Sequence, residues 1–269
     1  MLRILRVEWM KVRNYRTFWI LLAITLVSIP AASYIPFNLM KNSFPSGKGQ
    51  NILGSPFGFP DVWQTVSWNS SLLFFIPAIL VITLTTNEFT YKTHRQNVID
   101  GWSRKQFVTA KLIEVFLLSI LTTIAVLLTA FVFGFFNKKA GAGATATVSI
   151  WQESRFVFFY FVEMLSYSLI AFLMALFVKR AGLAMGLFFI YMLVEQVIVG
   201  ILGHSYDIKA VSYLPEEVTD KLIPFPYLKA MFAKQADWES HVPIYLLVAL
   251  LYMVIYCIAT GRKFLKSDL

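Results

Sequence analysis

Residues 112–136 read LIEVFLLSILTTIAVLLTAFVFGFF, a run of 25 residues in which Glu114 is the only charged side chain. A helix needs about 20 predominantly apolar residues to cross the hydrocarbon core of a bilayer. The run is also far longer than an ordinary strand, which has about 3–10 residues. It therefore predicts a membrane-spanning helix, and five further stretches of the chain follow the same pattern.

The composition of the whole chain agrees with this prediction. Of its 269 residues, 58% are hydrophobic and 14% are charged, whereas soluble domains average about 45–50% apolar and about 25% charged residues. The mean hydropathy is +0.65. The sequence predicts an all-α membrane protein, residues 1–269 forming one transmembrane domain, with spans at 18–37, 66–86, 112–136, 156–178, 181–202 and 242–260.

The basic residues predict the orientation of these spans. Fifteen of the 24 Lys and Arg lie in four segments, namely 1–17, 87–111, 179–180 and 261–269. Positively charged loops stay on the cytoplasmic side, so both termini, the 87–111 loop and the tight 179–180 turn are expected there. The Pro-containing segment 203–241 then lies outside, and it is expected to form short helices at the interface.

The N-terminal segment 1–17 has the pattern of an amphipathic helix. Leu2, Leu5, Trp9 and Val12 form one apolar stripe, and the basic residues fall largely off it. Such a helix is expected to lie in the membrane interface. The alternative interpretation is a plain basic flank of the first span.

The cytoplasmic segment 87–111 is longer than a simple connection between neighbouring helices, which commonly takes about 2–8 residues. Asp100 and Gly101 interrupt its helical pattern, and Ser103 is a suitable N-cap for the helix that follows. The segment is therefore expected to form two short helices with a corner between them, and to serve as a docking element.

At this segment the chain resembles the membrane subunit of ABC-2 type transporters, six-span permeases that work with a separate ATP-binding protein. In that family a Glu at the end of the second span leads into a Thr-containing stretch, a short apolar segment, a Ser-Arg pair and a Lys that opens the third span. The matching residues here, in chain order, are Glu88, Thr93, Val98 with Ile99, Ser103 with Arg104, and Lys111. Two positions depart from the pattern: Lys92 stands where the family carries Gly, and Gly101 or Trp102 stands where it carries Pro.

The resemblance implies a function for the loop and a set of partners. The 87–111 loop would contain the coupling helix that docks on an ATP-binding subunit, with ATP and magnesium held by that subunit and no cofactor on this chain. A second copy or a related permease would complete a dimer in a bacterial cytoplasmic membrane, in contact with membrane lipid. The expected docking residues are Glu88, Thr93, His94, Arg95, Gln96, Asn97, Val98, Ile99, Trp102, Ser103 and Arg104. The alternative for this loop is a solvated basic segment beside anionic headgroups.

Three acidic side chains fall within the predicted spans, where charges are costly. Glu114 lies one turn after Lys111 and is expected to pair with it. Glu163 and Glu195 each lie seven residues from the outer end of their span, about 10 Å deep at 1.5 Å per residue. They are candidates for a translocation path or a subunit seam. The alternative is two acids that are satisfied or protonated separately.

Enzymatic motifs are missing from the sequence. It has no Gly-x-x-x-x-Gly-Lys-Ser/Thr and no His-Glu-x-x-His, and its single cysteine excludes a site built from several cysteines. The net charge of +9 follows the membrane topology and does not indicate a nucleic-acid partner. The predicted function is therefore the permease subunit of an ATP-driven exporter, which is not an enzyme by itself. The alternatives are a secondary transporter and a membrane assembly or immunity component that transports nothing.

Overall fold

The computed structural model describes residues 2–43, 56–93, 96, 99, 103–137, 151, 153–206, 208–227 and 235–266. Within these residues all the regular structure is helical. The elements are α1 (Leu2–Arg13), α2 (Arg16–Ser43), α4 (Val62–Ser71), α5 (Phe75–Thr90), α7 (Arg104–Phe136), α8 (Arg155–Val178), α9 (Ala181–Ile198), the π-helix η1 (Val199–Ser205), the 3-10 helix η2 (Lys209–Tyr213), α10 (Pro215–Asp220) and α11 (Gln235–Lys266).

Five of the described helices are long and apolar enough to cross a membrane, and α4 with α5 makes a sixth if the pair is counted as one bent span. These six coincide with the six stretches expected from the sequence, which indicates an integral membrane protein. Some of the predicted spans were shorter than the helices of the structure. The first span continues to Ser43 as α2, the third begins at Arg104 as α7, and the last extends from Gln235 to Lys266 as α11.

The second span is broken, which the sequence did not predict. α4 and α5 meet at an angle of 48° across residues 72–74. Three-residue turns bridge the break, since Leu73 N–H donates to Ser70 and Ile76 N–H donates to Leu73. Pro77 lies in the first turn of α5, where its missing N–H is tolerated, whereas in a helix continued through the break it would remove the hydrogen bond to the Leu73 carbonyl.

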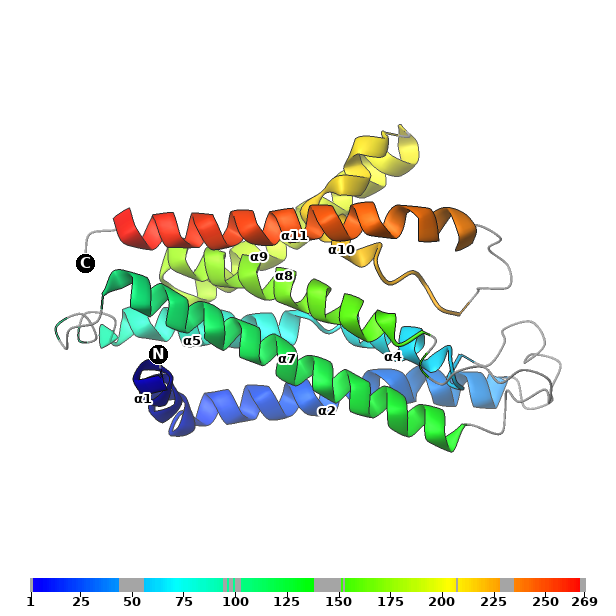
Figure 1. The fold of residues 1–269 in the computed structure, drawn as a ribbon, viewed down its shortest axis with the longest axis horizontal. Coiled ribbons are helices and arrows are strands. Elements are labelled where there is room, and N and C mark those ends of the chain that lie inside the picture. Colours follow the sequence, from blue (N-terminus) through cyan, green and yellow to red (C-terminus); the bar gives the residue numbers. More distant parts are fainter. Residues whose placement is uncertain are drawn as a thin grey trace.

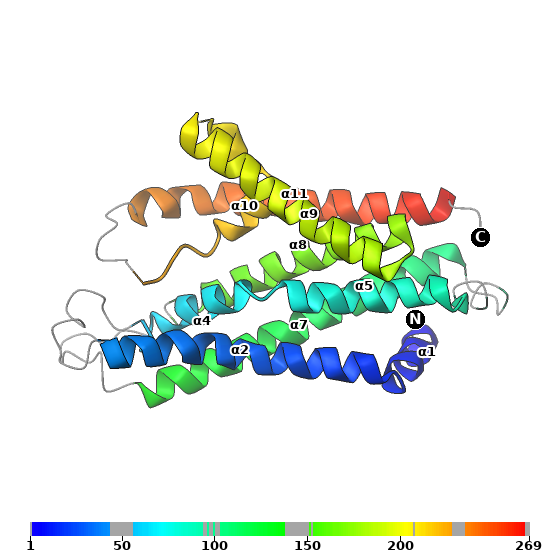
Figure 2. The ribbon, with the colours of Figure 1, turned by 180° about the vertical axis from the view of Figure 1, so that it is seen from behind.

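Helix α8 is the centre of the bundle. It contacts α4, α5, α7, α9 and α11, and most of its side chains are buried. Figures 1 and 2 show α7 and α11 along two sides of it, while α9 and η1 diverge from the bundle. α9 and α11 each carry a series of exposed large apolar side chains, so in a bilayer these faces meet lipid or another chain.

The basic segments gather at one end of the bundle, where Figure 1 places α1 and the end of α11. The turn between α8 and α9 consists of Lys179 and Arg180 alone, as predicted. Lys179 lies 5.4 Å from the ring centroid of Phe89, and Lys263 lies 4.7 Å from that of Phe177. The ends of α5, α8 and α11 are therefore neighbours. We refer to this as the basic end of the bundle.

The short helices expected between the last two spans lie beside the middle of α8 and α11, since the Tyr167 hydroxyl donates to Asp220 and the Tyr252 hydroxyl donates to the Tyr213 carbonyl. η2 and α10 occupy part of residues 208–227, and α10 contacts α8, α9 and α11. The segment after α10 is fixed to α4, because Gln64 Nε2 donates to the Pro224 carbonyl at 2.7 Å and the Tyr227 hydroxyl donates to Asn69 Oδ1 at 2.8 Å. These contacts join the segment after α10 to the first half of the broken span.

Candidate functional site

The described side chains of helix α1 agree only in part with the predicted apolar stripe. Val12 is buried, but Trp9 is 53% exposed, and the side chains of Leu2 and Leu5 lie outside the described residues. Glu8 is 5% exposed instead. The amphipathic pattern places charged residues on the outer face. It fails at Glu8 because the bundle supplies cationic partners for this carboxylate.

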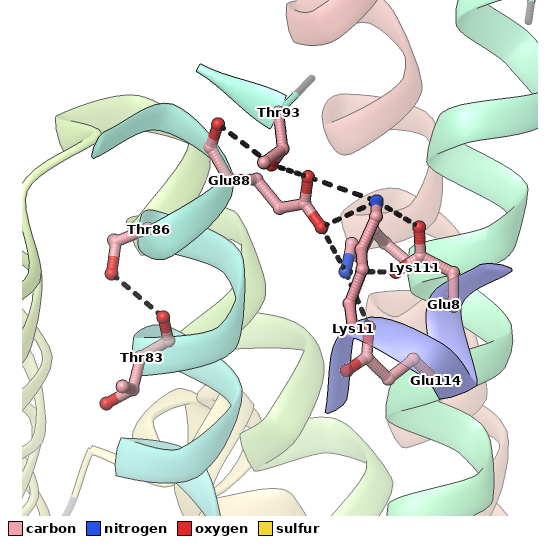
Figure 3. A network of polar contacts seen from close by, with 8 residues as sticks. All are labelled: Glu8, Lys11, Thr83, Thr86, Glu88, Thr93, Lys111 and Glu114. Carbon is pink, nitrogen blue, oxygen red and sulfur yellow. Dashed lines mark hydrogen bonds and ion pairs between the residues drawn. The ribbon is translucent and has the colours of Figure 1, made fainter. Parts of the chain in front are cut away.

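Five charged side chains meet where α1 touches the bundle, and Figure 3 shows how they converge from three helices. Lys111 Nζ on α7 lies 2.6 Å from Glu8, 3.1 Å from Glu88 and 2.8 Å from Glu114. Lys11 Nζ on α1 lies 2.8 Å from Glu8 and 3.1 Å from Glu88. These residues, Glu8, Lys11, Glu88, Lys111 and Glu114, are called the ion cluster below. The predicted pairing of Lys111 with Glu114 is confirmed.

The ion cluster is largely removed from solvent. The side chains of Glu8, Glu88 and Lys111 are only 4–6% exposed. The attraction between the charges is strong in such surroundings, but the cost of removing each charge from water offsets most of this attraction. Removal of one partner leaves an unpaired buried charge, and therefore lowers the stability by far more than the complete ion cluster raises it. The ion cluster therefore holds α1 in one position against α5 and α7.

The chain leaves α5 by a tight turn that returns to the ion cluster. The Thr93 hydroxyl donates a hydrogen bond to Glu88 Oε2. Lys92 between them has a φ of 55°, in the left-handed region that favours glycine. This turn brings Thr93 within contact of the same carboxylate that binds Lys11 and Lys111, so the start of the predicted docking loop is tied to the ion cluster.

The far end of the same loop is fixed by a capping box. Ser103 Oγ accepts a hydrogen bond from the Gln106 N–H at 3.2 Å, and Gln106 Oε1 accepts one from the Ser103 N–H at 2.9 Å. The pair satisfies two donors at the first turn of α7. The predicted N-cap at Ser103 is confirmed.

The predicted docking residues therefore divide into three groups. Glu88, Thr93, Ser103 and Arg104 lie at the two ends of the loop. Gln96 and Ile99 are exposed, Ile99 by 83%. Five predicted residues lie outside the described part of the chain, as do Asp100 and Gly101 of the predicted corner: His94, Arg95, Asn97, Val98 and Trp102.

Glu195, one of the two deep acids, anchors α10. Its Oε1 accepts hydrogen bonds from the backbone N–H groups of Glu216 at 2.6 Å and Glu217 at 3.1 Å, and its Oε2 accepts one from the Tyr191 hydroxyl at 2.7 Å. The first N–H groups of a helix have no partner within it. A carboxylate from α9 thus supplies the cap that α10 lacks.

Glu163, the other deep acid, has different neighbours. It is 3% exposed, lies beside Ser71 at the break of the second span, and interacts electrostatically with Asp220. Its Oε2 has no hydrogen-bond partner among the described residues. Asp220 accepts a hydrogen bond of 2.6 Å from the Tyr167 hydroxyl. Glu163 and Glu195 are thus linked through α10 rather than to each other.

The acids of α10 are unusual in their protonation. Burial, together with the charges of Glu195 and Asp220, raises the pKa of Glu216 to about 9. Burial raises the pKa of Asp220 to about 7 against the opposing effect of the Tyr167 hydrogen bond, and Glu217 and Glu195 add to the rise. Two carboxyl groups that the sequence did not single out therefore have pKa values raised far above the usual range of a carboxyl group. Their only sequence signal was an acidic segment between apolar ones.

Two further features concern binding. The described residues contain no group of three or more His, Cys, Asp or Glu side chains placed to hold a metal ion. Gly182 and Gly186 on α9 have no atom within 4 Å of an added Cβ, so their surface faces none of the described helices of this chain. The close helix approach suggested by their spacing stays a prediction for a second chain.

The fold and the ion cluster together define a class: a polytopic helical membrane protein whose N-terminal helix is locked to the basic ends of its second and third spans. The chain belongs to DUF2705, a family described as a protein of unknown function, whose sequence profile matches residues 19–269. No curated protein matches the chain.

Proposed function

We propose that this chain is the membrane-spanning permease subunit of an ATP-driven exporter of the ABC-2 type, and that it docks on a separate ATP-binding subunit through residues 88–104. A second copy or a related permease would complete the transport unit. ATP and magnesium would be held by the partner, and the basic end would face the cytoplasm.

The observation that carries this proposal is the ion cluster. A permease driven by a separate ATPase must pass movement from its docking surface to its spans. Here Glu88 stands at one end of the loop and binds Lys11 of α1, while Lys111 lies two turns beyond the other end and binds both Glu8 of α1 and Glu88. A displacement of the loop is therefore transmitted to α1, α5 and α7 together.

Lys92 adds a second, independent argument. It is the position at which the resembling family carries Gly, and its backbone lies in the left-handed region. A turn that requires this conformation explains a glycine preference. The local geometry therefore supports the alignment of the chain with the family motif at a residue where the sequence departs from it.

The test is affinity purification of the tagged chain from its native host, followed by mass spectrometry and an ATPase assay. Ile99→Ala is compared with Phe136→Ala, which removes an 80% exposed apolar side chain from the opposite end of α7. The proposal expects a protein with a P-loop to co-purify with the chain. The amount of this protein recovered should be about 5- to 30-fold lower with the Ile99 variant and unchanged with the Phe136 variant. A folded chain that is recovered without such a protein in every detergent contradicts the proposal.

A secondary transporter is the second candidate, and one observation favours it. The second span is broken next to Glu163, and discontinuous helices beside buried acids are typical of ion-coupled carriers. This candidate expects the chain alone, in liposomes, to admit protons down a pH gradient, with loss of the flux in Glu163→Gln. An ATPase that co-purifies, with no flux from the chain alone, would decide against it.

A further inference from the structure

A cavity of about 240 Å³ lies beside the ion cluster, between α1, α2, α5 and α7. Its walls are mostly apolar, with Val12, Phe18, Leu84 and Leu118 among them. The volume exceeds the roughly 150 Å³ of an engineered apolar cavity that binds benzene. It is sufficient for a segment of an alkyl chain.

One side of the cavity faces away from the bundle. Leu117 and Leu121 of α7 line it and are 53% and 38% exposed, and Trp9 of α1 lines it and is 53% exposed. In a bilayer, side chains exposed on the surface of a spanning helix meet acyl chains, and Trp is enriched at the level of the headgroups. An acyl chain therefore reaches the cavity from the membrane without crossing water.

The polar part of the cavity wall consists of charged groups, and their hydrogen bonds indicate which kind of ligand group they can bind. Glu8, Lys111 and Glu114 line it. Lys111 already binds three carboxylates, whereas Glu114 Oε1 is buried and has no hydrogen-bond partner among the described residues. An ionised carboxylate only accepts hydrogen bonds, so a ligand at this position must donate.

The charge of the ion cluster narrows the choice of donor. Three carboxylates and two ammonium groups leave one negative charge when all five are ionised. A cationic head bearing N–H groups matches both the charge and the free acceptor. A primary ammonium has three such donors, whereas a quaternary ammonium such as choline has none. The exposed Arg6 and Arg13 of α1 supply positive charge for a lipid phosphate near the same helix.

We infer that this cavity is a lipid site that holds one alkyl chain of a phosphatidylethanolamine-type phospholipid from the surrounding bilayer, with its primary ammonium hydrogen-bonded to Glu114. The inference goes beyond the proposed function, because it requires a bilayer but no ATP-binding partner. A lipid at this position would contact α1 and the ion cluster at once. The basic end would then sense the headgroup composition of its membrane.

The test uses the full chain in vesicles of equal parts dioleoyl phosphatidylethanolamine and dioleoyl phosphatidylcholine. The chain is extracted in mild detergent, and the retained lipid is measured by mass spectrometry. The wild type is expected to retain phosphatidylethanolamine in about tenfold excess. Equal retention of the two lipids, retention of neither, or a larger retention of phosphatidylglycerol when that lipid is included would overturn the inference.

Three variants test the assignment of residues. Glu114→Gln keeps the shape of the side chain and is expected to abolish the excess of retained phosphatidylethanolamine over phosphatidylcholine, without lowering the amount of phosphatidylcholine retained. Val115→Phe adds volume to the cavity wall and is expected to lower the retention of both lipids. Glu163→Gln, a buried acid of α8 outside the cavity, is the matched control and is expected to keep the excess. An excess that survives in both Glu114→Gln and Val115→Phe would place the lipid elsewhere.

Discussion

Replacing Lys111 by methionine tests the central claim about the ion cluster. Met keeps the apolar stem but removes the ammonium group that lies 2.6–3.1 Å from Glu8, Glu88 and Glu114. Three carboxylates would then share Lys11 as the remaining cation of the cluster. Breaking a buried ion pair by removal of one partner costs about 3–5 kcal/mol. At about 2–4 °C per kcal/mol for a chain of this size, the unfolding temperature should fall by about 6–20 °C.

The assay is thermal unfolding in detergent, followed by tryptophan fluorescence. Lys105→Met is the control, because Lys105 is exposed on the same helix and its loss should shift the unfolding temperature by less than about 2 °C. The double variant Glu8→Gln with Lys111→Met should cost at least about 1 kcal/mol less than the sum of the single variants. A Lys111→Met shift no larger than that of Lys105→Met, or additive costs in the double variant, would refute the reasoning.

Three other predictions use the same assay. Gly134→Ala should destabilise the chain by about 1–3 kcal/mol, because an added Cβ would lie 2.5 Å from the ring of Phe59. In Gly186→Ala the added Cβ meets no atom within 4 Å, so this variant should be neutral or stabilising by up to about 1 kcal/mol. Equal changes in the stability of the two variants would contradict the packing at Gly134. Lys92→Gly should raise stability by about 1 kcal/mol by relieving the left-handed backbone, and a loss of stability would show that the turn does not require it. The pKa of Asp220 is raised to about 7 and that of Glu216 to about 9, so the fold favours the neutral forms of both carboxyl groups. Their contribution to stability is complete below about pH 4, where both groups are also neutral in the unfolded chain, and it should be lost as the pH rises from about 4 to 9. The double variant Asp220→Asn with Glu216→Gln should make stability less dependent on pH over this range. An unchanged slope of stability against pH would contradict the assignment of the raised pKa values to these two residues.

The sequence predicted the spans because a bilayer imposes one strong rule, a continuous apolar stretch of fixed minimum length. Short-range pairs were predictable for a similar reason. Lys111 and Glu114 are one helical turn apart, and Ser103 precedes Gln106 by the spacing of a capping box. The three-dimensional fold adds little to interactions of this kind, since the helix alone brings the partners together.

The features that the sequence did not predict depend on contacts between distant segments. Glu8 was not singled out from the sequence, since its cationic partner Lys111 lies 103 residues further along the chain. Glu195 was recognised as costly, but its partners on α10 lie 21 and 22 residues away. The break at residues 72–74 lies just before Pro77, in the first turn of α5, and apolar composition alone does not distinguish a straight span from a bent one.

The hydrogen bonds of Glu195 have a mechanical consequence for α10. α9 diverges from the other spans (Figure 2), yet its Glu195 carboxylate holds the first turn of α10, which also contacts α8 and α11. A tilt of α9 must therefore either carry α10 along as one rigid body or break both backbone hydrogen bonds. In the first case the tilt drags Asp220 away from Tyr167 on α8. A tilt of α9 that carries α10 away from α8 thus separates Asp220 from its hydrogen-bond donor and changes the proton affinity of this carboxyl group.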